Sequence, residues 1–280
     1  MSDDHASLDE AEFLEQYRLD DYERPSVAAD VVTFAIRAES EESYRKNPKQ
    51  HLSLLLIRRG VHPFCDAWAL PGGFLQPTET IEQCAARELQ EETGVAPTAL
   101  RSVGVFSQPD RDPRGRILSV AFLSILTEEN VRIMAGNDAA AAQWFDVTFV
   151  ETDTDAALTL RHDDTVLSAK LRKISGCSAA GAYEIAENDG LAFDHAAIIA
   201  SAIAKLRRYG KNLEMVFDFL PEKFTLTQLQ MVQETITDIA MVPANFRRKI
   251  AAEVEETNEF VTGAGHRPAK LFIRKKEELI

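Results

Sequence analysis

Cysteine is scarce in this chain of 280 residues, which holds only Cys65, Cys84 and Cys177. Three cysteines so far apart exclude a disulfide framework or a zinc cluster, and they are typical of a reducing compartment. The chain also lacks an uncharged apolar run near the roughly 18 residues that a membrane span requires. Its first ten residues are acidic, unlike the basic and then apolar start of a signal peptide. We therefore expect a cytoplasmic protein with no membrane partner.

Positive charge is also in short supply, because 31 Lys and Arg stand against 45 Asp and Glu, a formal net charge of −14. Such a balance disfavours a protein that coats nucleic acid with its whole surface. The charge is unevenly distributed, however. Residues 1–24 hold nine acidic and two basic residues, whereas residues 245–276 hold eight basic and four acidic residues. A basic island on an acidic chain requires its own explanation.

The composition that remains, 45% hydrophobic and 27% charged, is that of a globular protein. Apolar and β-branched runs predict a series of strands, and apolar periodicity predicts two helices. The expected helices cover residues 78–93, closed by Gly94, and 195–209, capped by Asp194. The expected strands cover residues 27–36, 51–58, 68–70, 100–107, 117–126 and 143–145, with two weaker ones within 157–172. Residues 175–190, rich in Ser, Ala and Gly, are expected to contain a turn or a short linker, and residues 210–213 are expected to form a hinge. The pattern indicates an α/β domain with mixed strands over residues 1–210 and a separate small unit over 211–280.

The strongest pattern begins before the first expected helix and runs along it. At 100° per residue, Glu88, Glu91 and Glu92 project from one face, where three crowded carboxylates would cost stability on an ordinary helix. A divalent cation such as Mg²⁺ removes that penalty, because it takes oxygen ligands and completes its shell with water and substrate phosphates. The full pattern is Gly73-x5-Glu79-x7-Arg87-Glu88-Leu89-x-Glu91-Glu92-x-Gly94-Val95.

Two other features of this pattern have a physical role. Arg87 points to a different side of the helix, where it can pair with Glu79 and brace the preceding loop. Gly72 and Gly73 let the backbone come close to a metal or a substrate. The alternative is a solvated acidic helix face, but a chance match at nine specified positions has a probability on the order of 10⁻⁷.

This segment resembles the signature of the Nudix hydrolases at all nine positions. The resemblance implies an α/β/α sandwich with a mixed sheet, whose loop–helix–loop binds Mg²⁺ or Mn²⁺ and cleaves a nucleoside diphosphate linked to another moiety. It also implies that Glu88 and Glu92 are the principal metal ligands, with Glu91 bridging ions or orienting the attacking water. The catalytic residues implied in this way are Gly73, Glu79, Arg87 and Glu91.

Further segments resemble ADP-ribose pyrophosphatase-like members of the family, which implies hydrolysis of ADP-ribose to AMP and ribose 5-phosphate. They are RPSVAADVV (24–32), HPFCDAWALPGGFL (62–75), QPDRDPRGRILSVAFL (108–123) and LAFDHAAII (191–199). Within the third segment, Arg111, Arg114 and Arg116 suit an anionic substrate, because guanidinium groups bind phosphate oxygens bidentately. The alternative is a solvated hairpin loop in which Asp112 pairs with a neighbouring arginine. Asp138 is a candidate general base, or else an ordinary turn aspartate.

Other aromatic and histidine residues of these segments are expected to be structural. Trp68, Trp144 and Phe145 are predicted to pack in the core rather than to stack on a base. His62 and His195 have no motif that marks them as ligands, so both are expected to be structural histidines.

The last 70 residues predict a helix, a turn, a second helix and a hairpin. Thr227 is expected to cap the helix at 228–237, and Pro243 lies near the start of the second helix. Basic residues on that helix, followed by a basic hairpin, are typical of a winged helix-turn-helix that binds double-stranded DNA. The candidate DNA-binding residues are Asn245, Arg247, Arg248, Lys249, Arg267 and Lys270.

This arrangement resembles the C-terminal domain of the Nudix-related transcriptional regulators of NAD metabolism. The resemblance implies a homodimer that reads two half-sites. It leaves two functions open: an ADP-ribose hydrolase, and a regulator whose Nudix domain binds ADP-ribose with little turnover. A solvated surface or a dimerisation module is the alternative for the basic island.

Overall fold

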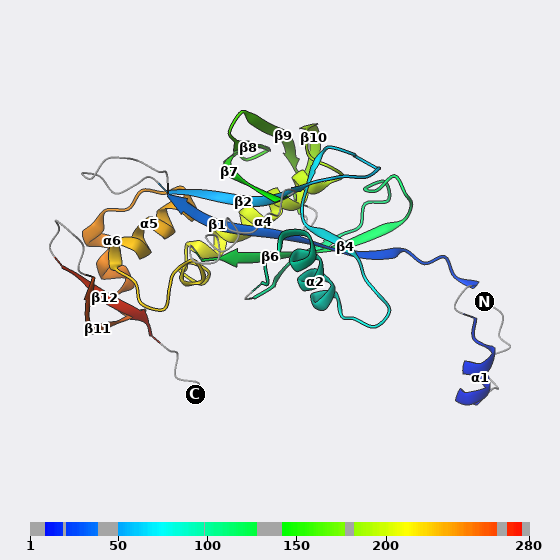
Figure 1. Ribbon diagram of the computed structural model, residues 1–280, viewed down its shortest axis with the longest axis horizontal. Helices are drawn as coiled ribbons and strands as arrows, with labels where there is room; N and C mark the ends of the chain where they lie inside the picture. Colours follow the sequence, from blue (N-terminus) through cyan, green and yellow to red (C-terminus); the bar gives the residue numbers. More distant parts are fainter. Residues whose placement is uncertain are drawn as a thin grey trace.

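The computed structural model describes residues 9–18, 21–38, 50–97, 99–127, 142–176, 182–261 and 268–275. Most of the strands belong to one large mixed sheet, shown in Figure 1. These strands are β1 (Ser26–Ala38), β2 (Gln50–Arg58), β3 (Trp68–Ala69), β4 (Gly72–Phe74), β5 (Arg101–Phe106), β6 (Ile117–Leu126), β7 (Ala142–Glu151), β8 (Asp155–His162), β9 (Thr165–Lys173) and β10 (Tyr183–Asp189). Their order is β10-β9-β8-β7-β2-β1-β6-β5, with β3 beside β2 and β4 beside β1. Only the pair β1 and β6 is parallel among these described strands.

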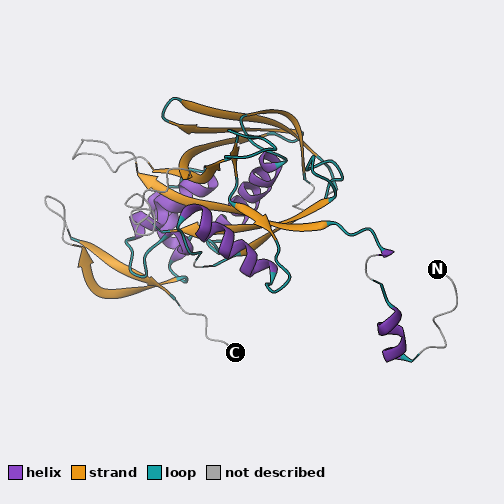
Figure 2. Ribbon diagram, turned by 45° about the vertical axis from the view of Figure 1, so that its right-hand side comes forward, coloured by secondary structure: helices purple, strands orange, loops and turns teal. Residues whose placement is uncertain are grey.

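The sheet separates two helices, α2 (Ile81–Thr93) and α4 (His195–Gly210), which lie on opposite faces (Figure 2). The central strand β1 shows why, because its side chains alternate between the two faces. Val32 and Phe34 pack in the core on the α4 side, whereas Ala29 and Val31 pack beneath α2. The expected α/β/α sandwich with a mixed sheet is confirmed.

Residues 175–176 form a turn, as expected within 175–190, but the same segment also holds a strand that the sequence did not predict. Strand β10 occupies residues 183–189 and pairs with β9 at the edge of the sheet. Tyr183 is buried there, and its hydroxyl donates to Glu151 at 2.6 Å. Most other side chains of this edge strand are polar and exposed, so the segment has little of the apolar pattern that predicts a strand. Cys177 lies outside the described residues.

The acidic N-terminal segment contains a short helix, α1 (Glu10–Gln16), which has no buried residue. Asp9 and Glu12 form a reciprocal capping box at its start, which satisfies two backbone N–H groups. In Figure 1 this helix lies away from the sheet. No helix in the described part of the chain is long and apolar enough to cross a membrane.

The C-terminal unit has the expected order of helix, helix and hairpin. Its elements are the 3-10 turn η4 (Phe217–Phe219), α5 (Leu226–Thr237), α6 (Pro243–Ile250), β11 (Val254–Val261) and β12 (Ala269–Arg274). Pro243 begins α6 as expected, but the predicted cap of α5 is wrong by two residues. Thr225, not Thr227, accepts from the backbone N–H of Gln228, while the Gln228 side chain accepts from Thr225 in return. Both threonines have a glutamine three residues later in the sequence, so the capping-box pattern alone does not choose between them, and the helix begins two residues earlier than expected.

The expected hinge at residues 210–213 is a packed junction between the two units. A Cβ added to Gly210 would lie 2.6 Å from Cγ2 of Ile236, so only glycine lets α4 approach α5 so closely. The side-chain Nε2 of Gln233 donates to the carbonyl of Gly210 at 2.8 Å. Leu206 and Leu213 belong to the same buried cluster as the α5 side chains. The core is therefore continuous through the junction.

Candidate active site

Helix α2 presents its carboxylates because its other face is fixed against the sheet. Cys84, Ala85 and Leu89 are fully buried beneath it, packed on β1 and its neighbours. Thr80 starts the helix with a capping box, and Gly94 ends it with a φ of 73°, as expected. The glutamate-bearing face is therefore directed towards Gly72 and Gly73 of strand β4.

Arg87 connects the start of the pattern to its end. Its guanidinium binds both carboxylate oxygens of Glu79, at 2.7 and 3.0 Å, and this pairing is the one expected from the sequence. The hydrogen bonds from Arg87 hold the pKa of Glu79 at about 2. However, the expectation that Arg87 points away from the other glutamates is wrong. Its Nη1 also donates to Glu88 at 2.6 Å and to Glu91 at 3.2 Å, because a guanidinium has five donors on a long, flexible stem.

Glu88 and Glu92 both lie against Gly72 and Gly73 at the start of β4. A Cβ on Gly73 would lie 2.3 Å from Oε1 of Glu88, so this close approach requires glycine. The backbone N–H of Gly72 donates to Oε2 of Glu92 at 2.9 Å. Burial raises the pKa of Glu92 to about 7, and the negative charges of Glu88 and Asp30 contribute. Glu88 is paired with Arg87, whereas Glu92 accepts from the backbone of β4.

The residues fit a divalent cation by their chemistry. Carboxylate oxygens are the ligands that Mg²⁺ prefers, and a bound cation would favour the charged form of Glu92. Glu91 is more open, with 60% of its side chain exposed. Within the described ranges, no group of three or more His, Cys, Asp or Glu side chains is placed so that it could hold a metal ion by itself. Mg²⁺ does not need one, because it usually keeps several water ligands and binds substrate phosphates through one or two carboxylates.

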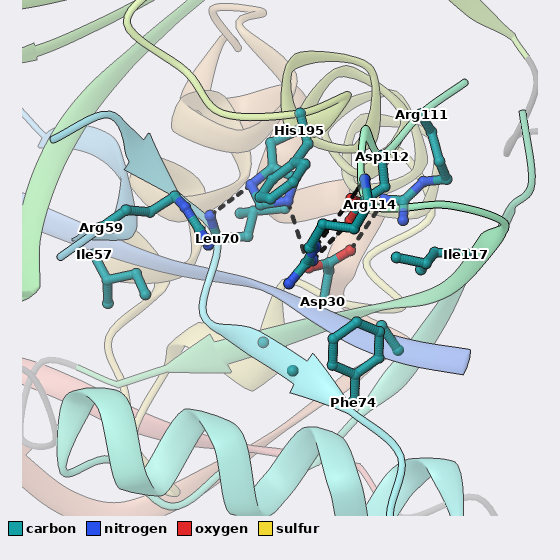
Figure 3. Close-up of a pocket in the computed structure, with 14 residues that line it drawn as sticks. Asp30, Ile57, Arg59, Leu70, Phe74, Arg111, Asp112, Arg114, Ile117 and His195 are labelled. Carbon is teal, nitrogen blue, oxygen red and sulfur yellow. Dashed lines mark hydrogen bonds and ion pairs between the residues drawn. The ribbon is translucent and has the colours of Figure 1, made fainter. Parts of the chain in front are cut away.

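Beside this helix lies a small cavity whose walls come from β1, β4, the loop after β2, the loop before β6, and the start of α4. Figure 3 shows it, with Arg59 and Arg114 reaching it from different elements. Its charged and polar lining residues are Asp30, Arg59, Arg111, Asp112, Arg114 and His195. The cavity thus brings basic and acidic side chains from several elements together.

The three arginines expected to bind phosphate have different environments. Arg114 lines the cavity with 43% of its side chain exposed; it pairs with Asp112 at 2.7 Å and lies over the ring of Phe74. Arg111 has only 4% of its side chain exposed, and its guanidinium is held by Asp194 and Asp30. Arg116 is exposed and donates to the backbone of the loop before it. Arg114 is thus the only one of the three that is both exposed and part of this wall.

The start of α4 differs from the expectation in one respect. Asp194 occupies the N-cap position, as expected, but its side chain makes no capping hydrogen bond. Instead its two oxygens accept from Nε and Nη2 of Arg111, at 2.9 and 2.6 Å. The buried guanidinium needs these charge-assisted bonds more than the helix end needs a side-chain cap.

Asp194 is therefore expected to stabilise the fold strongly. Replacing Asp194 by Asn should cost about 3–5 kcal/mol, because it leaves the buried charge of Arg111 with too few partners. Urea denaturation of the purified protein measures this loss. The matched control is Asp163→Asn, at a side chain that is 89% exposed, which should leave stability unchanged. Equal stability of Asp194→Asn and the wild type would contradict the assignment.

His195 is a structural histidine, as expected. Its Nδ1 accepts a hydrogen bond from the backbone N–H of Leu70 at 2.9 Å, and its Nε2 lies 3.5 Å from Asp30. Burial lowers the pKa of His195, so the ring is neutral and its proton is on Nε2. The ring holds the start of α4 against the segment that joins β3 to β4. Phe145 is fully buried, and it packs edge-on against Trp68, as expected of core residues.

Arg59 is a cavity residue that sequence reasoning missed. Its Nε donates to the carbonyl of Pro63 at 2.8 Å, and its guanidinium lies 4.8 Å from the centre of the Phe193 ring. Burial and the positive charge of Arg114 lower the pKa of Arg59. Two guanidinium groups that repel one another beside an open cavity favour an anionic ligand. In the sequence, the only indication of its role is that Arg58 and Arg59 form a pair of arginines at the end of a buried strand.

The candidate DNA-binding residues also differ in their exposure and in their partners. Arg247 and Arg248 are exposed on α6, and Arg248 donates to the side chain of Asn245 at 3.3 Å. Lys249 donates to the carbonyl of Lys211 at 2.9 Å, at the junction with α4. On the hairpin, Lys270 pairs with Glu256. Arg267, like the candidate base Asp138, lies outside the described residues.

Comparison with known proteins supports both units. A NUDIX domain model matches residues 44–165, and a model of the NrtR DNA-binding winged helix domain matches residues 216–273. An ADP-ribose pyrophosphatase of Methanocaldococcus jannaschii is 40% identical over 134 residues, which cover 48% of this chain and 68% of that protein. An ADPR responsive transcriptional repressor NtrR of Acinetobacter baylyi is 28% identical over 267 residues, which cover 94% of this chain and 87% of that protein.

Solved structures extend the similarity to nearly the whole chain. A MutT/nudix family protein from Enterococcus faecalis is 30% identical with a TM-score of 0.72, over 97% of this chain and 95% of that one. The NrtR of Shewanella oneidensis in complex with a 27mer DNA has the same fold, with a TM-score of 0.60 and 24% identity, over 89% and 93%. Fold and site together define a hydrolase domain joined to a winged helix. The chain belongs to the Nudix hydrolase family, with a C-terminal winged helix domain of the NrtR type.

Proposed function

We propose that the Nudix domain hydrolyses the pyrophosphate of a nucleoside diphosphate sugar, most directly ADP-ribose to AMP and ribose 5-phosphate, with Mg²⁺ or Mn²⁺. The observation that carries this proposal is the pair Glu88 and Glu92 against Gly72 and Gly73 of β4, beside a cavity that Arg59 and Arg114 line. The chemistry needs both, because a dianionic pyrophosphate must be neutralised before water can attack. The M. jannaschii relative, an ADP-ribose pyrophosphatase, supports the choice of substrate.

The residues of the site have different roles in this reaction. Glu88 and Glu92, with Glu91, would hold the divalent ion, which lowers the pKa of the attacking water and neutralises phosphate oxygens. Arg87 and Glu79 keep the carboxylate helix and its preceding loop in register, since they bridge the two. Gly73 leaves the space that Glu88 fills. These contacts position the ligand oxygens before any substrate enters.

Substrate binding is assigned mainly to the two guanidinium groups that line the smaller cavity. Arg114 and Arg59 would bind phosphate oxygens, while Arg111 fixes the loop that carries Arg114 through its buried pairs with Asp194. Arg116 is a further candidate, at the outer side of the same loop. Asp138 remains the candidate general base.

We also propose that the winged helix binds double-stranded DNA and that ADP-ribose regulates this binding. The supporting observation is the exposed pair Arg247 and Arg248 on α6, the second helix of a unit that matches the NrtR winged helix. The A. baylyi relative is an ADPR responsive repressor, which makes ADP-ribose an effector candidate for this chain. One winged helix per chain suits a homodimer that reads two half-sites.

A panel of nucleoside diphosphate sugars with Mg²⁺ tests the enzymatic proposal. We expect ADP-ribose to be hydrolysed with the highest kcat/KM and EDTA to abolish turnover, because the carboxylates need a cation to neutralise the pyrophosphate. Products are quantified by chromatography. Binding of ADP-ribose without any hydrolysis would instead leave the regulator as the function of the Nudix domain.

A further inference from the structure

Two bulky residues beside the cavity have a strained backbone. Phe64 has a φ of 60° and Phe193 a φ of 50°, both in the left-handed region that large side chains rarely adopt. They come from distant parts of the chain, yet their rings meet edge to face with centres 4.7 Å apart. Such strain persists where the surrounding structure enforces it, and it is concentrated at functional sites.

Phe193 holds several groups in place around itself. The guanidinium of Arg59 lies over its ring, and that of Arg114 lies 5.5 Å from its centre. His195 packs against it with ring centres 5.3 Å apart. Phe193 is thus already in contact on its faces, whereas Phe64 keeps 41% of its surface exposed. Of this aromatic pair, Phe64 is the one with a ring free to receive a ligand.

A second, larger cavity begins at this pair. It has a volume of about 940 Å³ and shares Phe193 and Arg111 with the arginine-lined cavity as a common wall. Its apolar lining includes Phe64, Val105 and Ile185, from the loop after β2 and from strands β5 and β10. This volume lies within the range of cavities that take whole small-molecule ligands.

The charges of the larger cavity define what it can accept. Asp110 and Glu184 line it, and the arginine in its lining, Arg111, is already paired with Asp194. Such a cavity repels phosphate, whereas its carboxylates can accept hydrogen bonds from amino groups and sugar hydroxyls. The same acidic lining disfavours a second copy of this chain as the occupant, because the chain carries a net charge of −14.

We propose that the larger cavity binds the nucleoside half of the substrate, with its base stacked on Phe64, while the pyrophosphate lies between Arg59 and Arg114. This inference rests on the proposed function and adds a base subsite to it. Phe193 is a positioning residue, because it orients both Phe64 and Arg59 at the boundary between the two cavities. Base stacking on an aromatic ring explains why two strained phenylalanines are held at this boundary.

The test is calorimetric binding of three probes to the full-length protein in EDTA, where no turnover is expected: ADP-ribose, AMP and ribose 5-phosphate. Phe64→Ala should weaken ADP-ribose and AMP by about tenfold or more, because it removes base stacking. Ribose 5-phosphate, which has no base, should bind as it does to the wild type. Phe64→Trp should restore the affinity for AMP. Phe260→Ala, at an aromatic residue of β11 that is 54% exposed, is the matched control and should change nothing.

The outcomes separate the two proposals. If the wild type binds ADP-ribose and AMP, and Phe64→Ala binds them equally well, the base subsite is wrong and the proposed function stands. An equal loss for all three probes, or a change in oligomeric state of Phe64→Ala by light scattering, would also overturn the subsite. If the wild type binds none of the probes and hydrolyses no ADP-ribose with Mg²⁺, the proposed function fails and the subsite fails with it.

Discussion

Replacement of Glu92 by Gln should lower ADP-ribose hydrolysis at least a hundredfold while the protein stays folded. The change removes one charged ligand from the proposed metal site but keeps the shape of the side chain and the acceptor for the N–H of Gly72. The measurement is steady-state turnover with saturating Mg²⁺. Glu82→Gln, at an exposed residue of the first turn of the same helix, is the matched control and should keep wild-type turnover.

The same variant has a second expected result, in stability without metal. The pKa of Glu92 is raised to about 7 in the folded protein, so folding favours its protonated form. Its contribution to stability is therefore complete below the pKa of an unfolded glutamate and is lost as pH rises through about 7. In EDTA, Glu92→Gln should melt at a higher temperature than the wild type at pH 8, and this advantage should vanish at pH 5. Unchanged turnover together with unchanged melting would remove Glu92 from the metal site.

The second large effect is expected in DNA binding. Changing both Arg247 and Arg248 to Ala should weaken specific binding by several kcal/mol, on the order of 1–3 for each base-specific hydrogen-bonded pair that the change removes. A chain with a net charge of −14 must present its basic residues on one face to bind DNA, and these two are exposed on α6. The measurement is a mobility shift on DNA upstream of the gene at 50 and 200 mM salt. The logarithm of the wild-type binding constant should fall linearly with the logarithm of the salt concentration, with a slope of about −0.9 per phosphate neutralised.

The control for this prediction is Arg172→Ala, an exposed arginine on β9 of the Nudix domain, which should not affect DNA binding. Protection of two half-sites one helical turn apart would agree with a homodimer. ADP-ribose should shift the wild-type affinity, since an effector must bind the free and the DNA-bound forms differently. Wild-type binding no tighter than to random DNA would argue against the regulator, whatever the double variant does.

Local spacing explains why the carboxylate helix could be predicted from the sequence. Which residues share a helix face, where glycine closes the helix, and how Arg87 reaches Glu79 all depend on fewer than 25 consecutive residues. The mixed sheet could be predicted for a similar reason, because buried strands such as β1 are apolar on both faces. Edge strand β10 could not, since its exposed polar residues resemble those of a loop.

The rest of the site depends on contacts between distant segments, which periodicity does not report. In the sequence, Asp194 has the position of a helix cap. Only the fold shows that its carboxylate instead binds Arg111, which lies 83 residues earlier. Phe64 and Phe193 likewise come from distant parts of the chain and meet only in the fold. Arg59 follows a strand as many surface arginines do. Its closeness to Arg114 is set by the packing of two loops and has no counterpart in local sequence.

The packed junction at Gly210 has a consequence for how such chains can be recombined. Gly210 packs against Ile236, and Leu213 belongs to the core that both units share. If the two units were separated, each would therefore expose apolar side chains to water. A winged helix grafted from a relative would need a surface that packs against the end of α4. Without one, apolar side chains would be exposed to water. The two units therefore share one continuous core, and their shared surface constrains change on both sides of the boundary.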